Sequence, residues 1–136
     1  MKTAKLKQLF VAIVVAMSGI SCGGNPSGTG RVHGIITLDG QPYPDAQVVF
    51  TPAEGRPSSG ITDSNGQYEL TYVRDVKGAA IGKHTISITT IQKSSSDRGD
   101  DPPFKETIPD RYNVRTGLSE DVKPGDNNFD FALTSQ

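Results

Sequence analysis

Arg31–Leu38, with the sequence RVHGIITL, is the stretch that decides the fold. Val32, Gly34, Ile36 and Leu38 occupy alternate positions in it, and a β-strand points alternate side chains to opposite faces. No part of the chain after Arg31 has helical spacing over more than two turns. The period of two recurs in four further segments, at 46–51, 67–72, 84–89 and 128–133. Alternation with one polar side indicates antiparallel strands that pack one face and expose the other.

Turn-forming residues separate these segments. Asn65-Gly66 predicts a hairpin with a type I′ turn between 61–62 and 67–68. Pro124-Gly125 predicts a type II turn that joins 118–122 to 128–133, and Asp39-Gly40 is expected to end the first strand. Two short strands, at 60–62 and 118–122, bring the expected number to seven. We therefore predict an all-β fold, a seven-stranded antiparallel Greek-key β-sandwich.

The alternation also predicts which side chains face the core. His84 falls on an inward position, whereas His33 falls on the solvent face. The other inward residues are expected to be apolar or aromatic ones: Val32, Ile36, Leu38, Ala46, Val48, Phe50, Tyr68, Leu70, Tyr72, Ile86, Ile88, Phe129, Phe131 and Leu133.

The composition limits the range of functions. The chain has 136 residues, a single cysteine and a formal charge of -1, and apolar residues make up 34% of it. This length suits one domain and not two complete cores. One cysteine can form no internal disulfide and supplies no set of thiols for zinc or an iron–sulfur cluster. The near-neutral charge gives no electrostatic case for nucleic-acid binding.

Residues 1–21 have the organisation of an export signal. Lys2, Lys5 and Lys7 form a positive region, and the apolar run Leu9–Met17 follows it. Nine residues span only ~14 Å as a helix, at a rise of ~1.5 Å per residue. The hydrocarbon core of a bilayer is ~30 Å thick, so this run is too short to cross it. The pattern therefore predicts a signal peptide and not a membrane span.

The signal ends at Cys22, and the residues before it suggest a lipid anchor. Gly19-Ile-Ser-Cys22 resembles the lipobox of bacterial lipoproteins, although Gly19 stands where that motif usually has Leu, Val or Ile. The resemblance implies cleavage before Cys22 and acylation of its thiol. Ordinary cleavage after Ser21 is the alternative, and it would leave a soluble exported protein with a free thiol. Residues 22–30 then form the lipidated cysteine and a flexible Gly/Ser-rich tether, followed by the sandwich domain at 31–136.

Four motifs in order carry a resemblance to a known family. They are Val32–Gly40 (VHGIITLDG), Pro44–Phe50 (PDAQVVF), Thr62–Leu70 (TDSNGQYEL) and Gly82–Ile88 (GKHTISI). Together they resemble the carboxypeptidase regulatory-like domain, a transthyretin-like (prealbumin-like) sandwich, over roughly 31–133. The segment 109–113 also resembles small bacterial lipoproteins of this type. The resemblance implies a non-catalytic accessory, structural or binding module of the cell envelope, with His84 at a position that is usually aromatic.

The sequence offers no set of residues for catalysis or metal binding. His33 and His84 each stand alone on a strand, whereas a catalytic zinc needs about three converging protein ligands. Asp63 opens a segment similar to a calcium loop, but position 12 of that loop is Arg74 and not a glutamate. No arrangement of serine, histidine and acid can be argued, because the serines cluster in loops. We therefore predict a protein that is not an enzyme and has no cofactor or metal.

Transthyretin-like enzymes provide a second test of this prediction. Hydrolases of the urate pathway with this fold end in Tyr-Arg-Gly-Ser, whereas this chain ends with FALTSQ at 131–136. Intradiol dioxygenases of similar topology need two tyrosines and a His-x-His pair for iron, and this chain has no such pair. The resemblance therefore adds no catalytic residues.

Three aromatic residues remain as candidate contacts with a ligand or partner: Tyr43, Phe104 and Tyr112. Residues 92–108 are long and without period, which indicates a functional or a disordered loop, with 104–112 packing back on the sandwich. We predict a lipid-anchored protein of the cell membrane or outer membrane whose domain faces the periplasm or exterior. Its expected role is a structural or protein-interaction module. An exported glycan- or ligand-binding accessory module is the alternative.

Overall fold

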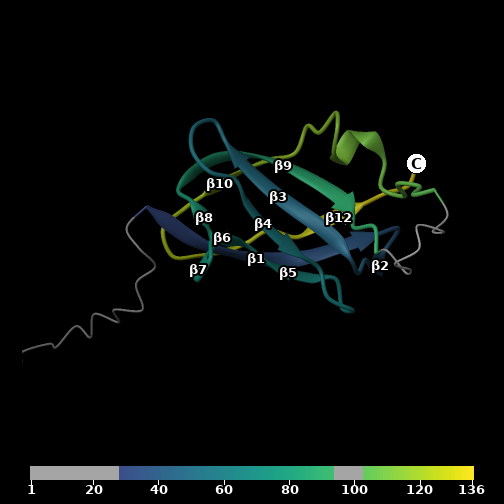
Figure 1. Cartoon of the computed structure of the whole chain (residues 1–136), viewed down its shortest axis with the longest axis horizontal. Coiled ribbons are helices and arrows are strands. Elements are labelled where there is room, and N and C mark those ends of the chain that lie inside the picture. Colours follow the sequence, from purple (N-terminus) through teal and green to yellow (C-terminus); the bar gives the residue numbers. More distant parts are fainter. Residues whose placement is uncertain (1–27, 94–102) are drawn as a thin grey trace, which may run out of the picture.

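The computed structural model describes residues 28–93 and 103–136, and nearly all of their regular structure is β (Figure 1). The one exception in this part of the chain is a single-turn 3-10 helix, η1 (Asp110–Tyr112). No helix within the described ranges has the length and apolar character needed to cross a membrane. The strands are β1 (Thr29–Leu38), β2 (Gln41–Pro42), β3 (Ala46–Pro52), β4 (Ser58–Ile61), β5 (Gln67–Glu69), β6 (Thr71–Val73), β7 (Val76–Lys77), β8 (Ala79–Ala80), β9 (Gly82–Thr90), β10 (Ser119–Val122), β11 (Asp126–Asn128) and β12 (Phe131–Leu133).

The first sheet has six strands and is built around β1, because every other strand in it pairs with β1. The strands β2, β5 and β8 run antiparallel to β1, whereas β11 and β12 run parallel to it. A parallel neighbour needs a long crossover connection, and here the connection from β1 to β11 includes the whole second sheet. β1 begins at Thr29, so the last two residues assigned to the tether belong to the strand.

The second sheet also has six strands, in the order β10-β9-β3-β4-β6-β7, and all of its pairs are antiparallel. Its longest pairing joins β3 and β9, from Ala46 opposite Thr90 to Pro52 opposite His84. The predicted all-β architecture is therefore confirmed, and two largely antiparallel sheets lie on either side of one core. This is the arrangement of a β-sandwich.

The core contains the residues that the alternation predicts. Phe50 is fully buried near its centre, with ring centroids 5.8 Å from His84, 6.0 Å from Phe129 and 6.4 Å from Phe131. His84 is only 1% exposed, which agrees with its expected place among core residues. Leu38, Tyr72 and Phe129 are partly buried instead of fully buried. The remaining buried apolar residues are Val32, Ile36, Ala46, Val48, Tyr68, Leu70, Ala79, Ile86, Ile88, Ile108, Val122 and Leu133.

The expected number of strands differs from the observed one. The sequence predicts seven strands, whereas the described residues form twelve strand segments. One cause is that Leu70 separates β5 from β6, which pair with strands of different sheets. A segment whose sequence alternates without interruption therefore forms two strands, because the chain passes from one sheet to the other within it.

The hairpin predicted around Asn65 is wrong, although the chain does turn there. The strands on either side, β4 and β5, pair with β3 and β1 respectively, so the turn links the two sheets. A type I′ turn needs positive φ at both central residues, and Asn65 does not have it. The Asp63 carboxylate accepts hydrogen bonds from the N–H groups of Asn65 (2.9 Å) and Gln67 (3.0 Å). This local Asx bonding fixes a different turn.

A two-residue turn of the predicted type is found at Asp39-Gly40 instead. Both residues have positive φ, 50° and 82°, and they join β1 to β2 with Leu38 opposite Gln41. The Asp39 carboxylate also accepts hydrogen bonds from the Ser135 N–H (2.9 Å) and hydroxyl (2.6 Å). The turn therefore holds the segment that follows β12.

Candidate functional site

The aromatic residues singled out in the sequence lie at one end of the sandwich. In Figure 1 this end carries β2, η1 and the segment after β12, and the start of β1 lies at the opposite end. Tyr43 follows β2, Phe104 precedes η1, and Tyr112 is the last residue of η1. Cys22 lies outside the described residues. This end is called the distal end below.

Tyr43 and Tyr112 pack against the core and have their hydroxyl groups engaged. The Tyr43 hydroxyl lies 2.8 Å from Thr90 Oγ1 and also contacts Thr107 Oγ1. The Tyr112 hydroxyl accepts a hydrogen bond from the Thr134 N–H at 3.1 Å. Phe104 differs, because 45% of it is exposed. Of the three, only Phe104 offers a large apolar surface to a partner.

Glu106 holds the segment before η1 against the sandwich. Its carboxylate accepts hydrogen bonds from the Thr90 N–H (3.1 Å), the Thr90 hydroxyl (2.7 Å) and the Ile108 N–H (2.9 Å). Burial raises the pKa of Glu106, but these bonds and one from the Thr107 backbone outweigh it and hold the pKa below its ordinary value. Ile108 is 2% exposed and completes the core. The predicted packing of this segment on the sandwich is confirmed.

Tyr112 has an unusual acidity for a tyrosine. Hydrogen bonds with the side chain and backbone of Thr134, together with Arg111, lower the pKa of Tyr112 to about 8. The Arg111 guanidinium lies 4.8 Å from the centroid of the Tyr112 ring, and Arg111 also donates to the carbonyl of Gln136 at 2.7 Å. The distal end is therefore a tightly bonded surface.

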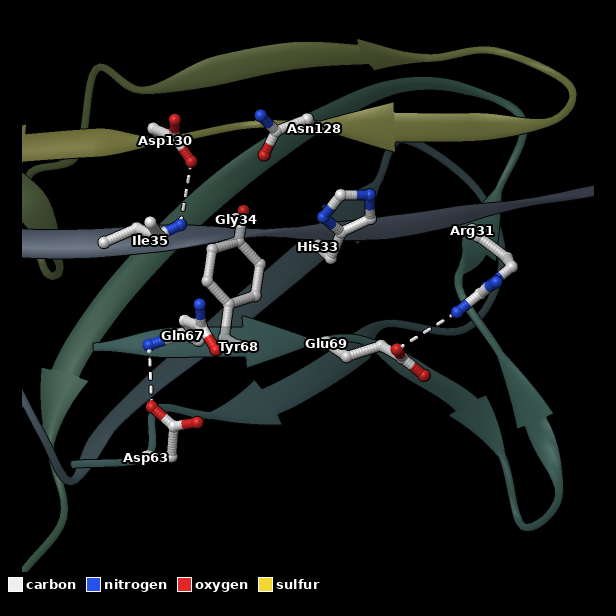
Figure 2. Close-up of a pocket in the computed structure, with 10 residues that line it drawn as sticks. All are labelled: Arg31, His33, Gly34, Ile35, Asp63, Gln67, Tyr68, Glu69, Asn128 and Asp130. Atoms are coloured by element: carbon white, nitrogen blue, oxygen red, sulfur yellow. Dashed lines mark hydrogen bonds and ion pairs between the residues drawn. The ribbon is translucent and has the colours of Figure 1, made fainter. Parts of the chain in front are cut away.

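A second site lies on the outer face of the first sheet. It is a groove of about 610 Å³ that crosses β5, β1 and the β11–β12 connection (Figure 2). We call it the sheet groove. Its lining residues come from β1, β5, β11, the β11–β12 connection and the turn at Asp63: Arg31, His33, Gly34, Ile35, Asp63, Gln67, Tyr68, Glu69, Asn128 and Asp130.

The sheet groove lies where the parallel hydrogen-bond ladder that joins β1 to β11 and β12 is interrupted. Phe129 N–H donates to the carbonyl of His33 at 2.9 Å, so Ile35 N–H is the next donor of the parallel ladder. That N–H donates instead to Asp130 Oδ1 at 2.8 Å. The carbonyl of Phe129 accepts the Tyr68 hydroxyl at 2.6 Å. The side chains of Asp130 and Tyr68 therefore bind the Ile35 N–H and the Phe129 carbonyl, which would otherwise bond to each other, and this break separates β11 from β12.

The Arg31–Glu69 ion pair lies at the opposite end of the sheet groove from Asp63 and Asp130 (Figure 2), and a second polar contact joins His33 to Asp126. Arg31 lies 3.2 Å from Glu69, and His33 Nε2 lies 2.8 Å from Asp126 Oδ2. The hydrogen bond from His33 is the main cause that lowers the pKa of Asp126. All four side chains are substantially exposed, so that solvent screens both pairs.

The two histidines lie in different environments. His33 is on the outer face, as predicted, and His84 Nε2 is 2.7 Å from the carbonyl oxygen of Ala80 inside the core. In the part of the chain that the structure describes, no group of three or more His, Cys, Asp or Glu side chains could hold a metal ion. Asp63 serves the turn described above, and its Oδ1 atom is occupied by backbone N–H groups.

Sequence reasoning did not find the sheet groove. The only signal for it is the polar side of the alternating pattern, which places His33, Gln67 and Glu69 on one outer face. Asn128 and Asp130 join them because β11 and β12 run parallel to β1, and no local pattern predicts that pairing.

The chain matches no model of a known protein family, and no curated protein matches it significantly. The resemblance to the carboxypeptidase regulatory-like domain therefore stays a prediction that rests on the four motifs.

Proposed function

We propose that this chain is a non-catalytic, lipid-anchored β-sandwich protein of the bacterial cell envelope that acts as a structural or protein-interaction module. Its sandwich would be a Greek-key fold of the transthyretin-like, carboxypeptidase regulatory-like type. The all-β architecture with two sheets around one core supports this finer assignment. The signal-like segment 1–21, followed by Cys22, supports the anchor.

The orientation of the sandwich relative to Cys22 is the observation that carries the proposal. β1 begins at Thr29, only seven positions after Cys22, and runs ten residues to Leu38. At ~3.3 Å per residue, the strand is about 33 Å long. The distal end therefore lies about that far from the point where the tether joins β1. An acylated Cys22 would hold the start of β1 near the bilayer, so that the distal end faces away from it.

The distal end has features that suit a partner. Phe104 is 45% exposed and Val114 is 79% exposed, whereas the neighbouring Glu106 and Tyr43 are fixed by hydrogen bonds. A surface that is already ordered loses less conformational entropy when it binds. The distal end would thus present apolar side chains from a rigid support.

Metabolic labelling with an alkyne analogue of palmitate tests the anchor. The full chain, expressed in a bacterium that processes lipoproteins, should take up the label and fractionate with membranes. Cys22→Ala should lose both properties because it has no thiol. Ser21→Ala keeps a small residue before the cysteine and serves as the matched control, which should label as the wild type does. Equal labelling of the wild type and Cys22→Ala would overturn the proposed anchor.

An exported glycan- or ligand-binding accessory module is the second candidate function. The sheet groove favours it, because amide and carboxylate side chains line a hollow of about 610 Å³. A glycan array probed with the purified full chain is the direct test. Binding to a defined oligosaccharide would support this candidate, and the absence of binding at millimolar ligand would eliminate it.

A further inference from the structure

We propose that the sheet groove receives a basic side chain, arginine or lysine, from a segment of a partner polypeptide. This inference rests on the proposed role as a protein-interaction module and names the chemistry of the partner. It places the contact on the outer face of β1 and not at the distal end. The argument uses the rigidity of the groove, its unbalanced charge and the apolar surface between its charged groups.

The sheet groove has a rigid floor. A Cβ atom at Gly34 would lie 1.9 Å from the carbonyl oxygen of Phe129, so glycine is required for the two backbones to approach this closely. The Tyr68 ring crosses at the same point, and its hydroxyl is bonded to that carbonyl. Tyr68 is 3% exposed, and burial raises its pKa well above the ordinary value. The floor is therefore a fixed, neutral surface.

Two carboxylates are held in position on opposite sides of β1. Asp130 Oδ1 accepts the Ile35 N–H at 2.8 Å, and Asp63 Oδ1 accepts the Gln67 N–H at 3.0 Å (Figure 2). In each case backbone groups bind one oxygen and leave the second oxygen available to a ligand. Such carboxylates need no reorganisation before they accept hydrogen bonds from a cation.

The charge of the sheet groove is unbalanced. Arg31, the one lining residue with a permanent positive charge, is paired with Glu69 at 3.2 Å and lies toward the other end of the groove (Figure 2). Asp63 and Asp130 have no cationic partner among the groove residues. An incoming positive charge would therefore be attracted to this half of the groove, and an anionic ligand would be repelled.

An apolar surface lies between the two carboxylates. Ile35 is 37% exposed and belongs to β1, between Asp63 and Asp130 in Figure 2. Lysine and arginine bury their methylene stems on apolar surface while the charged group reaches a polar partner. A neutral sugar would find no exposed aromatic platform here, since the Tyr68 ring is nearly fully buried. The groove thus suits a basic side chain better than a neutral glycan.

Fluorescence anisotropy with the purified full chain tests the proposal. The probe is a fluorescein-labelled peptide in which glycine alternates with arginine, and its control has citrulline, which is neutral and nearly isosteric, in place of arginine. Asp63→Asn and Asp130→Asn keep the oxygen that accepts the backbone N–H and remove the charge. Each should weaken binding about threefold, and the double variant about tenfold, the range expected of exposed ion pairs. Asp121→Asn on β10 makes the same charge change outside the groove and should bind as the wild type does.

Amide NMR spectra of the same samples locate the contact and verify folding. Arginine-dependent binding that is weakened by the groove variants, with shifts at Ile35 and Gln67, supports the proposal. Three results would overturn it: equal binding of the citrulline peptide, equal affinity in the double variant, or no binding of the arginine peptide. Binding of a neutral oligosaccharide that shifts the same amides would assign the groove to the second candidate function instead. Loss of palmitate labelling would remove the proposed anchor and leave these results unchanged.

Discussion

Gly34→Ala should be among the most damaging single substitutions in this protein. The new Cβ would lie 1.9 Å from the oxygen and 2.6 Å from the carbon of the Phe129 carbonyl. Since Cβ atoms do not approach such atoms within roughly 3 Å, β1 and the β11–β12 connection would have to separate by about 1 Å. Both of these nearest atoms belong to the Phe129 backbone, so a side-chain rotation cannot relieve the clash.

The expected cost follows from the bonds at this point. Separation by that amount would stretch the bond from Phe129 N–H to the His33 carbonyl (2.9 Å) and the bond from the Tyr68 hydroxyl to Phe129 (2.6 Å). Each such bond contributes about 1 kcal/mol. Overpacking of a close contact adds about 1–3 kcal/mol. The free energy of unfolding should therefore fall by about 3–5 kcal/mol, a large part of the stability of a small domain.

Urea denaturation of the purified full chain, followed by far-UV circular dichroism, measures this change. Gly117→Ala is the matched control, because nothing lies within 4 Å of its added Cβ. The control should stay within about 0.5 kcal/mol of the wild type. A decrease of less than about 1 kcal/mol in Gly34→Ala would refute the packing argument. A midpoint for Gly117→Ala as low as that for Gly34→Ala would refute it too.

Three further predictions concern single groups. Absorbance at 295 nm should show Tyr112 ionising near pH 8, and Thr134→Val should move this midpoint up toward the ordinary 10. Because folding lowers the pKa of Tyr112, its ionisation stabilises the folded state. This contribution to the free energy of unfolding is complete above about pH 10 and is lost as the pH falls through about 8. Glu106→Gln should lower the free energy of unfolding by about 1–2 kcal/mol at pH 7, because Oε1 accepts from the Thr90 N–H, the Thr90 hydroxyl and the Ile108 N–H, and an uncharged amide oxygen accepts these bonds more weakly than a carboxylate oxygen. Since the folded pKa of Glu106 is depressed, urea midpoints of this variant and the wild type should converge as the pH falls below about 4.5, and a gap that persists there would contradict the argument. Ser58→Ala should stabilise the protein by about 0.5–1 kcal/mol in thermal denaturation, because its hydroxyl is fully buried and no described residue bonds to it.

The inner face of each sheet could be predicted from the sequence. Val32, Ile36, Val48, Phe50 and Ile86 alternate with less buried positions, and all five are fully buried. The signal is local, because successive side chains of a strand point to opposite faces whatever the strand pairs with. The same pattern placed His84 inside and His33 outside.

Turn types were predicted less well, because they depend on neighbouring side chains. Asn65 and the glycine after it form a common hairpin pair, but the Asp63 carboxylate binds the local N–H groups and fixes another turn. Asp39 adopts the positive φ that had been expected at Asn65. The strands next to each turn decide whether it closes a hairpin or carries the chain to the other sheet.

By itself, the sequence determined that the body is all-β and which side chains its strands bury, since both follow from a period of two along short segments. It also supplied the signal-like start and Cys22, which are properties of adjacent residues. Tertiary structure alone decided that Asp126, Asn128 and Asp130 stand beside His33 and Ile35. These residues are more than 90 positions apart, and a parallel pairing between the two ends of the domain leaves no local trace in the chain.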